Sequence, residues 1–138
     1  MNISTVCVDA NLVVRLFIDP QDSGIDELWR EWQLAGTRFV APALLLYEVV
    51  NTIQQYIRRG QHALSKALSL PIEYVQDQKI HQHALELANR FSLWATYDTH
   101  YLATADRYQA DFWTVDRKLV RIVQHQLPWV HLVKNAGL

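Results

Sequence analysis

Short apolar segments alternate with helical patterns along the whole of this 138-residue sequence. The apolar segments are rich in β-branched residues and show no sustained polar alternation, which is typical of strands covered on both faces. Because a helical pattern separates each strand from the next, the connections can cross over to parallel neighbours. We therefore predict the α/β class, as a three-layer α/β/α sandwich with a central, mainly parallel five-stranded sheet. The strands are expected at residues 3–8, 38–41, 72–75, 112–115 and 129–133.

Proline positions help to bound the helices between these strands. A helix at residues 11–18 stops before Asp19-Pro20, because the residue before a proline disfavours the helical region. A later helix has Pro42 at its first position and ends near residues 58–60. Since that helix is apolar nearly all round, we expect it to be among the most buried. The other helices are expected at residues 23–35, 62–69, 77–91 and 97–105 and directly after Asp116.

The composition favours one domain, residues 1–138, with a substantial core. Half of the residues are hydrophobic and 20% are charged, and no linker-like segment or internal repeat interrupts the chain. The net charge of -1 neither indicates nor excludes a nucleic-acid partner. The apolar runs are too short to span a membrane and the start of the chain does not resemble a secretory signal. With a lone Cys7, we expect a cytoplasmic protein that does not enter membranes.

Four acidic residues, Asp9, Glu48, Asp98 and Asp116, stand out from this pattern. Asp9 and Asp116 follow expected strands, and ligand sites of parallel sheets lie beyond the carboxyl ends of strands, where the strand order reverses. Asp9, Asp98 and Asp116 each have an ordinary explanation as residues that cap or begin helices. Glu48 has none, because it lies in mid-helix among apolar residues with no basic residue within one turn.

A cluster of these acids would need a cation. Two carboxylates about 4 Å apart repel each other by roughly 4 kcal/mol at an effective dielectric constant near 20. Mg²⁺ and Mn²⁺ prefer oxygen ligands and would relieve that repulsion. Zinc fits less well, because one Cys and scattered His residues do not supply its usual ligands. If the fold brings the four acids together, the sequence predicts a Mg²⁺ or Mn²⁺ site.

The sequence resembles a PIN domain in four motifs that keep the family's order and spacing over nearly the whole chain. Its compact form is most similar to the VapC-type toxins of type II toxin–antitoxin pairs. One departure is Thr99-His100 after Asp98, where smaller residues are expected. The motifs are Val8-Asp9-Ala10-Asn11, Tyr47-Glu48-Val49-Val50-Asn51, Tyr97-Asp98 with the following Tyr101-Leu102-Ala103-Thr104-Ala105, and Thr114-Val115-Asp116-Arg117-Lys118-Leu119.

The resemblance implies a Mg²⁺- or Mn²⁺-dependent endoribonuclease that leaves a 5′-phosphate and a 3′-hydroxyl. Asp9 and Asp98 would be the most direct metal ligands, and Glu48 and Asp116 would complete the catalytic pocket directly or through water. The resemblance also implies a cognate antitoxin protein as partner and a homodimer. Residues that would orient the acids are Asn11, Asn51 and Thr114. Basic residues near the acids that we expect to contact RNA phosphates are Arg15, Arg117, Lys118 and Arg121.

Rival functions fit the sequence less well. A receiver domain needs adjacent acids after the first strand, whereas Ala10 and Asn11 follow Asp9. A phosphatase of the haloacid dehalogenase type needs a second Asp where Asn11 stands. A non-catalytic binding protein on this scaffold has no reason to keep four mutually repelling acids. A stand-alone PIN nuclease for RNA processing or DNA repair remains the main alternative to a toxin.

Overall fold

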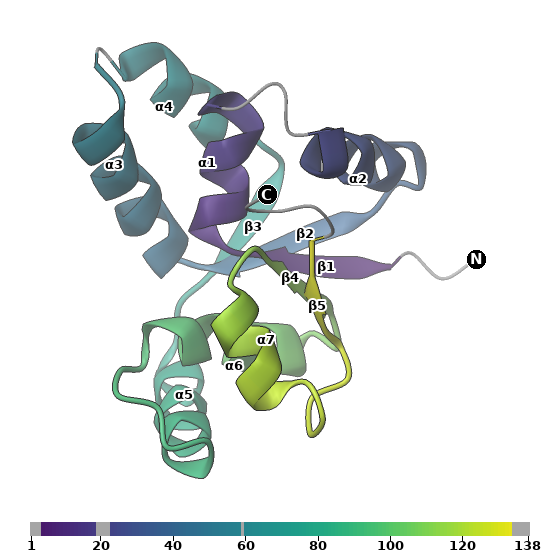
Figure 1. The fold of residues 1–138 in the computed structure, drawn as a ribbon, viewed down its shortest axis with the longest axis vertical. Helices are drawn as coiled ribbons and strands as arrows, with labels where there is room; N and C mark the ends of the chain where they lie inside the picture. The colour runs from purple at the N-terminus through teal and green to yellow at the C-terminus, as the bar shows by residue number, and fades with distance from the viewer. Residues whose placement is uncertain (1–3, 19–22, 59, 134–138) are drawn as a thin grey trace.

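The computed structural model describes residues 4–18, 23–58 and 60–133. Ile3 of the first expected strand and Asp19-Pro20 after the first expected helix lie outside these residues. Within them, a five-stranded sheet lies between two layers of helices (Figure 1). All four neighbouring strand pairs are parallel, so the predicted α/β/α sandwich is confirmed. No helix in the described part of the chain is long and apolar enough to cross a bilayer.

The sheet has the strand order β3-β2-β1-β4-β5. In the central strand β1, Cys7 lies opposite Val40 on one side and Phe112 on the other, and all three are buried. Cys7 thus serves as a small apolar core residue. The strands are β1 (Thr5–Val8), β2 (Arg38–Pro42), β3 (Ile72–Val75), β4 (Asp111–Thr114) and β5 (Val130–Leu132).

The helices divide into two layers because the chain reverses its direction across the sheet. It first moves outward from β1 to β3 and then returns to β4 and β5, and right-handed crossovers place the connections of the two directions on opposite faces. The reversal falls between β1 and β4, which are paired neighbours. One face carries α1 (Ala10–Ile18), α2 (Ser23–Leu34), α3 (Leu44–Tyr56) and α4 (Gln61–Leu68), and the other carries α5 (Gln78–Arg90), α6 (Tyr97–Arg107) and α7 (Arg117–Val123) (Figure 1).

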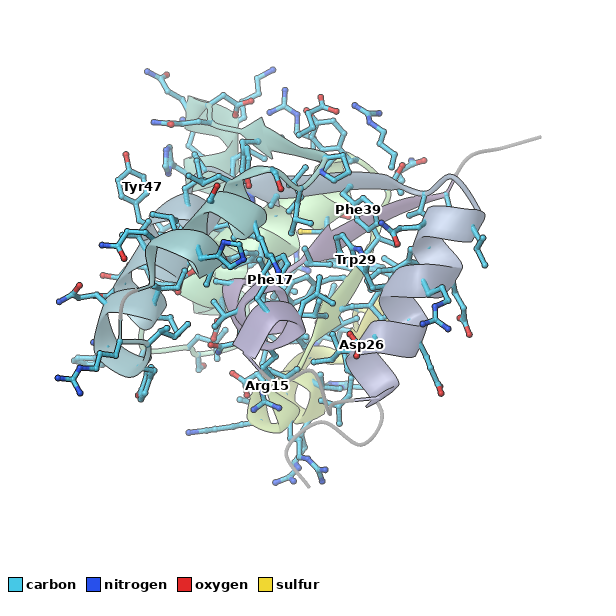
Figure 2. The ribbon with its side chains drawn as sticks, turned by 90° about the horizontal axis from the view of Figure 1, so that it is seen from above. Arg15, Phe17, Asp26, Trp29, Phe39 and Tyr47 are labelled. Carbon is cyan, nitrogen blue, oxygen red and sulfur yellow. The ribbon has the colours of Figure 1, made fainter. Side chains whose placement is uncertain are left out.

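Aromatic packing fixes α2 to the sheet. The ring of Trp29 stacks on Phe39 of β2 with centroids 4.7 Å apart, and Figure 2 shows these two side chains facing each other. Trp32, one turn further along α2, meets Phe39 and Trp113 edge-on at 5.8 and 5.9 Å. These contacts bridge β2 and β4, so they hold the strands on either side of β1 in place.

The predicted start of the third helix is wrong. Pro42 is the last residue of β2 and lies in register with Val75, and the Ala43 N–H donates to the Val75 carbonyl at 3.0 Å. The fixed φ of proline suits both a strand end and a first helical turn. Here the pairing of Pro42 with Val75 of β3 places it at the strand end. The helix therefore begins at Leu44, and it ends at Tyr56 rather than near residues 58–60.

The expectation that this helix is among the most buried is also wrong, because α6 has six buried residues of 11 and α3 has three of 13. Only Leu45, Val49 and Ile53 are buried in α3. Large apolar side chains on its other side are exposed, because a helix of an outer layer covers the core with one face only. They are Tyr47, Val50 and Tyr56.

Candidate active site

The four predicted acids come together at the carboxyl ends of β1 and β4, where the strand order reverses. Asp9 directly follows β1, Asp116 follows β4 by two residues, Glu48 lies on α3 and Asp98 lies in the first turn of α6. Negative charges of Asp98 and Glu48 raise the pKa of Asp9, and those of Asp116 and Glu48 raise the pKa of Asp98. Each acid thus feels at least one other, and we call the four the acid cluster.

Asp9 is held by two hydrogen bonds. Its Oδ1 accepts from the Leu12 N–H at 2.8 Å, and its Oδ2 accepts from the Thr114 hydroxyl. Burial raises the pKa of Asp9 to about 6, against the lowering effect of these hydrogen bonds, and the charges of Asp98 and Glu48 add to the rise. The bond to Leu12 caps the start of α1, as the ordinary explanation of Asp9 expects. The raised pKa means that the ionised form of Asp9 is unfavourable at this buried position.

Thr114 connects the ends of two strands. Its buried hydroxyl donates to Asp9, and the same oxygen accepts from the Asp116 backbone N–H at 3.1 Å. The Asp116 carboxylate accepts from the Leu119 N–H at 3.1 Å and so caps α7, which confirms the expected helix start. One hydroxyl therefore sets the positions of two acids relative to each other.

Glu48 has a neutral partner that the sequence reasoning missed. The Tyr101 hydroxyl donates to Glu48 Oε1 at 2.6 Å. Tyr101 is only 2% exposed, and its ring stacks on Phe112 with centroids 5.9 Å apart. Burial, together with the charge and hydrogen bond of Glu48, raises the pKa of Tyr101, so the phenol stays protonated. A buried Tyr needs a hydrogen-bond partner, but no sequence signal indicates which one it has.

Asp98 begins α6 at the edge of the cluster. Its residue is exposed, yet desolvation of the carboxyl is the main reason why its pKa is raised to about 6, followed by the charges of Asp116 and Glu48. The ion pairs among the described residues leave the whole acid cluster without a basic partner. They are Arg38–Glu73, His83–Asp106, Arg107–Asp77 and His131–Asp111.

The donors of the acid cluster fit Mg²⁺ or Mn²⁺. All four are carboxylates, and hard divalent cations prefer oxygen ligands. In residues 4–18, 23–58 and 60–133, no group of three or more His, Cys, Asp or Glu side chains is already arranged to hold an ion. Mg²⁺ commonly takes only one or two carboxylates directly and completes its shell with water, so it does not require such a preformed cage. Burial and the Asp9 charge raise the pKa of the Cys7 thiol, which keeps it from acting as a ligand.

The remaining predicted residues lie on helices that carry an acid of the cluster or directly follow one. Asn11 is exposed at the start of α1, and Asn51 is exposed on α3 beside a shallow hollow lined by Tyr47 and Val50. Arg15 is half-buried on α1 (Figure 2). The other basic candidates, Arg117, Lys118 and Arg121, are exposed on α7, which Asp116 begins. Their roles stay predictions.

Comparisons with known proteins agree with this architecture. A chain of a toxin–antitoxin complex from Klebsiella pneumoniae is 19% identical, with a TM-score of 0.67 over 91% of this chain and 95% of that one. A chain of VapBC2 from Rickettsia felis bound to a promoter DNA fragment is 18% identical, with a TM-score of 0.69 over 93% and 96%. PAE2754 from Pyrobaculum aerophilum is 18% identical, with a TM-score of 0.66 over 96% and 90%. At these identities the likeness shows a shared fold.

The two comparisons by sequence had different outcomes. No match was found among the curated proteins. The family model described as the PIN domain matches residues 6–124, a range that includes the whole acid cluster. The chain therefore belongs to the PIN domain family.

Proposed function

We propose that this PIN domain is a Mg²⁺- or Mn²⁺-dependent endoribonuclease and the toxin of a VapBC-type pair. The acid cluster is the observation that carries the proposal, because four carboxylates without a basic partner among the described residues have the donor chemistry that a divalent cation prefers. The similarity to chains of toxin–antitoxin complexes supports the toxin role, and it implies an antitoxin as partner. A homodimer and a cytoplasmic location are part of the same proposal.

The four acids of the cluster would have different roles in holding the ion. Asp9 and Asp98 would hold the ion most directly, and Glu48 and Asp116 would do so directly or through water. When bound, the ion supplies an activated water and offsets the charge that develops on the phosphate. The chain contributes preorganisation, because Thr114 orients Asp9 and Tyr101 orients Glu48 before substrate arrives.

The RNA backbone would be positioned by basic side chains beside the cluster. The candidates are Arg15 on α1 and Arg117, Lys118 and Arg121 on α7. Both helices start from an acid of the cluster, so Arg117 and Lys118 in the first turn of α7 are the nearer candidates, whereas Arg15 and Arg121 lie in the last turns of their helices. Phosphate contacts of this kind orient the strand but do not read its sequence.

Cleavage of RNA by the purified protein tests the nuclease. We expect cleavage with Mn²⁺ or Mg²⁺, none with a chelator, and none by Asp98→Asn with Mn²⁺. Asp106→Asn is the matched control, because Asp106 lies on the same helix and makes only an exposed pair with His83. Cleavage by Asp98→Asn at the wild-type rate, or cleavage that ignores the chelator, would contradict the proposal.

Expression in bacterial cells separates a toxin from a stand-alone nuclease. The wild type should arrest growth, Asp98→Asn should not, and co-expression of the reading frame directly upstream of the gene should restore growth. Normal growth with active, well-expressed wild-type protein would favour an RNA-processing nuclease, and preferential cleavage of damaged DNA would favour a repair nuclease.

A further inference from the structure

A small apolar pocket is lined by two tyrosines, each of which adjoins an acid of the cluster in the sequence. The start of α3, the end of β3 and the first turns of α5 and α6 form its walls, and its volume is about 210 Å³. We propose that this pocket binds one unpaired nucleobase of the RNA strand next to the phosphate that is cut, with Tyr47 and Tyr97 as its stacking surfaces. The inference rests on the proposed ribonuclease function. Its main lining residues are Pro42, Tyr47, Ile80, His81, Tyr97 and His100, and we call it the tyrosine pocket.

The position of the tyrosine pocket ties it to the cluster. Tyr47 directly precedes Glu48, and Tyr97 directly precedes Asp98. Neighbouring Cα atoms are about 3.8 Å apart, so two walls of the pocket begin one residue from two of the acids. Because adjacent side chains on a helix point in different directions, the pocket and the acids lie on neighbouring faces of α3 and of α6.

The two tyrosines offer free aromatic surface. Tyr47 is 74% exposed and projects from α3 away from the body of the protein (Figure 2), and Tyr97 is 62% exposed. Single-stranded RNA is commonly bound by stacking its unpaired bases on such rings. Both rings therefore leave aromatic surface that a nucleobase could stack on.

The charge and size of the pocket suit a base rather than a phosphate. The carboxylate in its wall, Asp77, already accepts from the Ile80 N–H and from Arg107, so it is satisfied within the protein. The other walls are mostly apolar, which favours an uncharged flat ring. A volume of about 210 Å³ lies below the roughly 300–1,000 Å³ of pockets for drug-sized ligands and suits a single ring system.

A histidine pair supplies polar groups in the same wall. His100 Nδ1 lies 2.5 Å from the Thr96 carbonyl oxygen and must donate to it, since a carbonyl only accepts. In the neutral His100 ring Nε2 is then the acceptor, and His81 Nδ1–H donates to it at 2.9 Å. The pair is thus held in a fixed orientation.

A cycle that combines protein and substrate changes tests the pocket. The probe is a short single-stranded RNA cut by the wild type, prepared with and without an abasic nucleotide at each position beside the cut. Tyr97→Ala and Tyr47→Ala should each lower kcat/KM about 5- to 150-fold, which corresponds to stacking of one base. At one position, removal of the base should lower kcat/KM of the wild type by a similar factor. The same removal should lower kcat/KM of the tyrosine variants little further. Phe at either position should retain activity, because its ring still stacks.

Tyr56→Ala is the matched control. Tyr56 lies on α3, as Tyr47 does, and is 77% exposed, but it does not line the pocket. Equal effects of Tyr56→Ala and Tyr97→Ala, or abasic losses that the variants leave unchanged, would overturn the pocket. So would a change of oligomeric state in light scattering with Tyr47→Ala or Tyr97→Ala, which would make this face an interface between copies. Melting temperatures verify that each variant folds.

Binding separates this inference from the proposed function. Fluorescence anisotropy of labelled single-stranded RNA with Asp98→Asn measures the pocket without cleavage. The tyrosine changes are made in the Asp98→Asn protein. If Tyr97→Ala weakens RNA binding and Tyr56→Ala does not, the pocket is supported even if the wild type cuts no RNA. Cleavage with unchanged binding and rates in the tyrosine variants would keep the nuclease and reject the pocket, and absence of RNA binding would reject it as well.

Discussion

At the scale of single residues, Thr114 determines how the acid cluster is held. Its hydroxyl donates to Asp9 and accepts from the Asp116 N–H, and its residue is fully enclosed. Buried polar groups that lose their partner cost about 1–3 kcal/mol. Its replacement therefore affects both the stability of the fold and the charge state of the site.

Thr114→Val should lower the free energy of unfolding by about 1–3 kcal/mol, because it leaves polar groups of Asp9 and Asp116 without a partner. In the wild type the hydrogen bond from Thr114 lowers the pKa of Asp9, so the loss of this bond should raise that pKa. The acid limb of the pH–rate profile should therefore move to higher pH in the variant. Denaturant unfolding and RNA cleavage across pH measure the two effects, and Thr114→Ser should restore both. A variant with unchanged stability and pH profile would contradict the bridging role.

Asp98→Asn should raise stability in the absence of metal, with a clear pH dependence. Asp98 ionises near 3.8 in the unfolded chain and near 6 in the fold, so the folded wild type holds the extra proton between these values. Wild-type stability therefore falls as pH rises through that window. The variant should melt on the order of a few degrees higher at pH 7.5, and the gap should close toward pH 4. A gap that is constant with pH would show that ionisation of the desolvated Asp98 carboxyl is not its cause.

At the scale of elements, the junction of β4 and α7 gives one acid two roles. Asp116 caps α7 through the Leu119 N–H, and its charge also raises the pKa of Asp98. Asparagine is as good a cap as aspartate but carries no charge. The two roles can therefore be separated by substitution at one position.

Asp116→Asn keeps the cap and removes a charge that acts on Asp98, so it should be at least as stable as the wild type, and Asp116→Ala should be about 1 kcal/mol less stable than Asp116→Asn. Both variants should lose metal-dependent cleavage, because both lack the carboxylate. Thermal unfolding and RNA cleavage, measured on the same preparations, test this separation. Full activity of Asp116→Asn would reduce Asp116 to a helix cap.

The elements also show what sequence reasoning can find. Asp9 and Asp116 were predicted because residues after parallel strands gather at one edge of the sheet. The bond from Tyr101 to Glu48 was not, because it joins residues 53 positions apart on helices of opposite layers and depends on where those layers meet at the edge of the sheet. Pro42 suits a strand end as well as a helix start, so pairing with Val75 had to decide. Local patterns thus locate the acids, whereas their supporting contacts come from tertiary packing.

At the scale of the whole molecule, the reversal of strand order brings the two helical layers to one site. Glu48 belongs to the layer of α1 to α4, and Asp98 belongs to the layer of α5 to α7. Asp9 and Asp116 come from the two strands between which the order reverses. A ligand bound by all four would therefore connect both layers through the sheet and stabilise the whole fold.

Mn²⁺ should raise the melting temperature of the intact protein. A ligand that binds only the folded state adds about 2.7 kcal/mol when its concentration is 100 times its dissociation constant. Metal ligands must be deprotonated, and Asp9 and Asp98 gain protons as pH falls through about 6. The shift should therefore be large at pH 7.5, vanish near pH 5, and be lost in Asp98→Asn but kept in Asp106→Asn. An equal Mn²⁺ shift in Asp98→Asn and Asp106→Asn would place the ion elsewhere, because only the first removes a charge from the acid cluster.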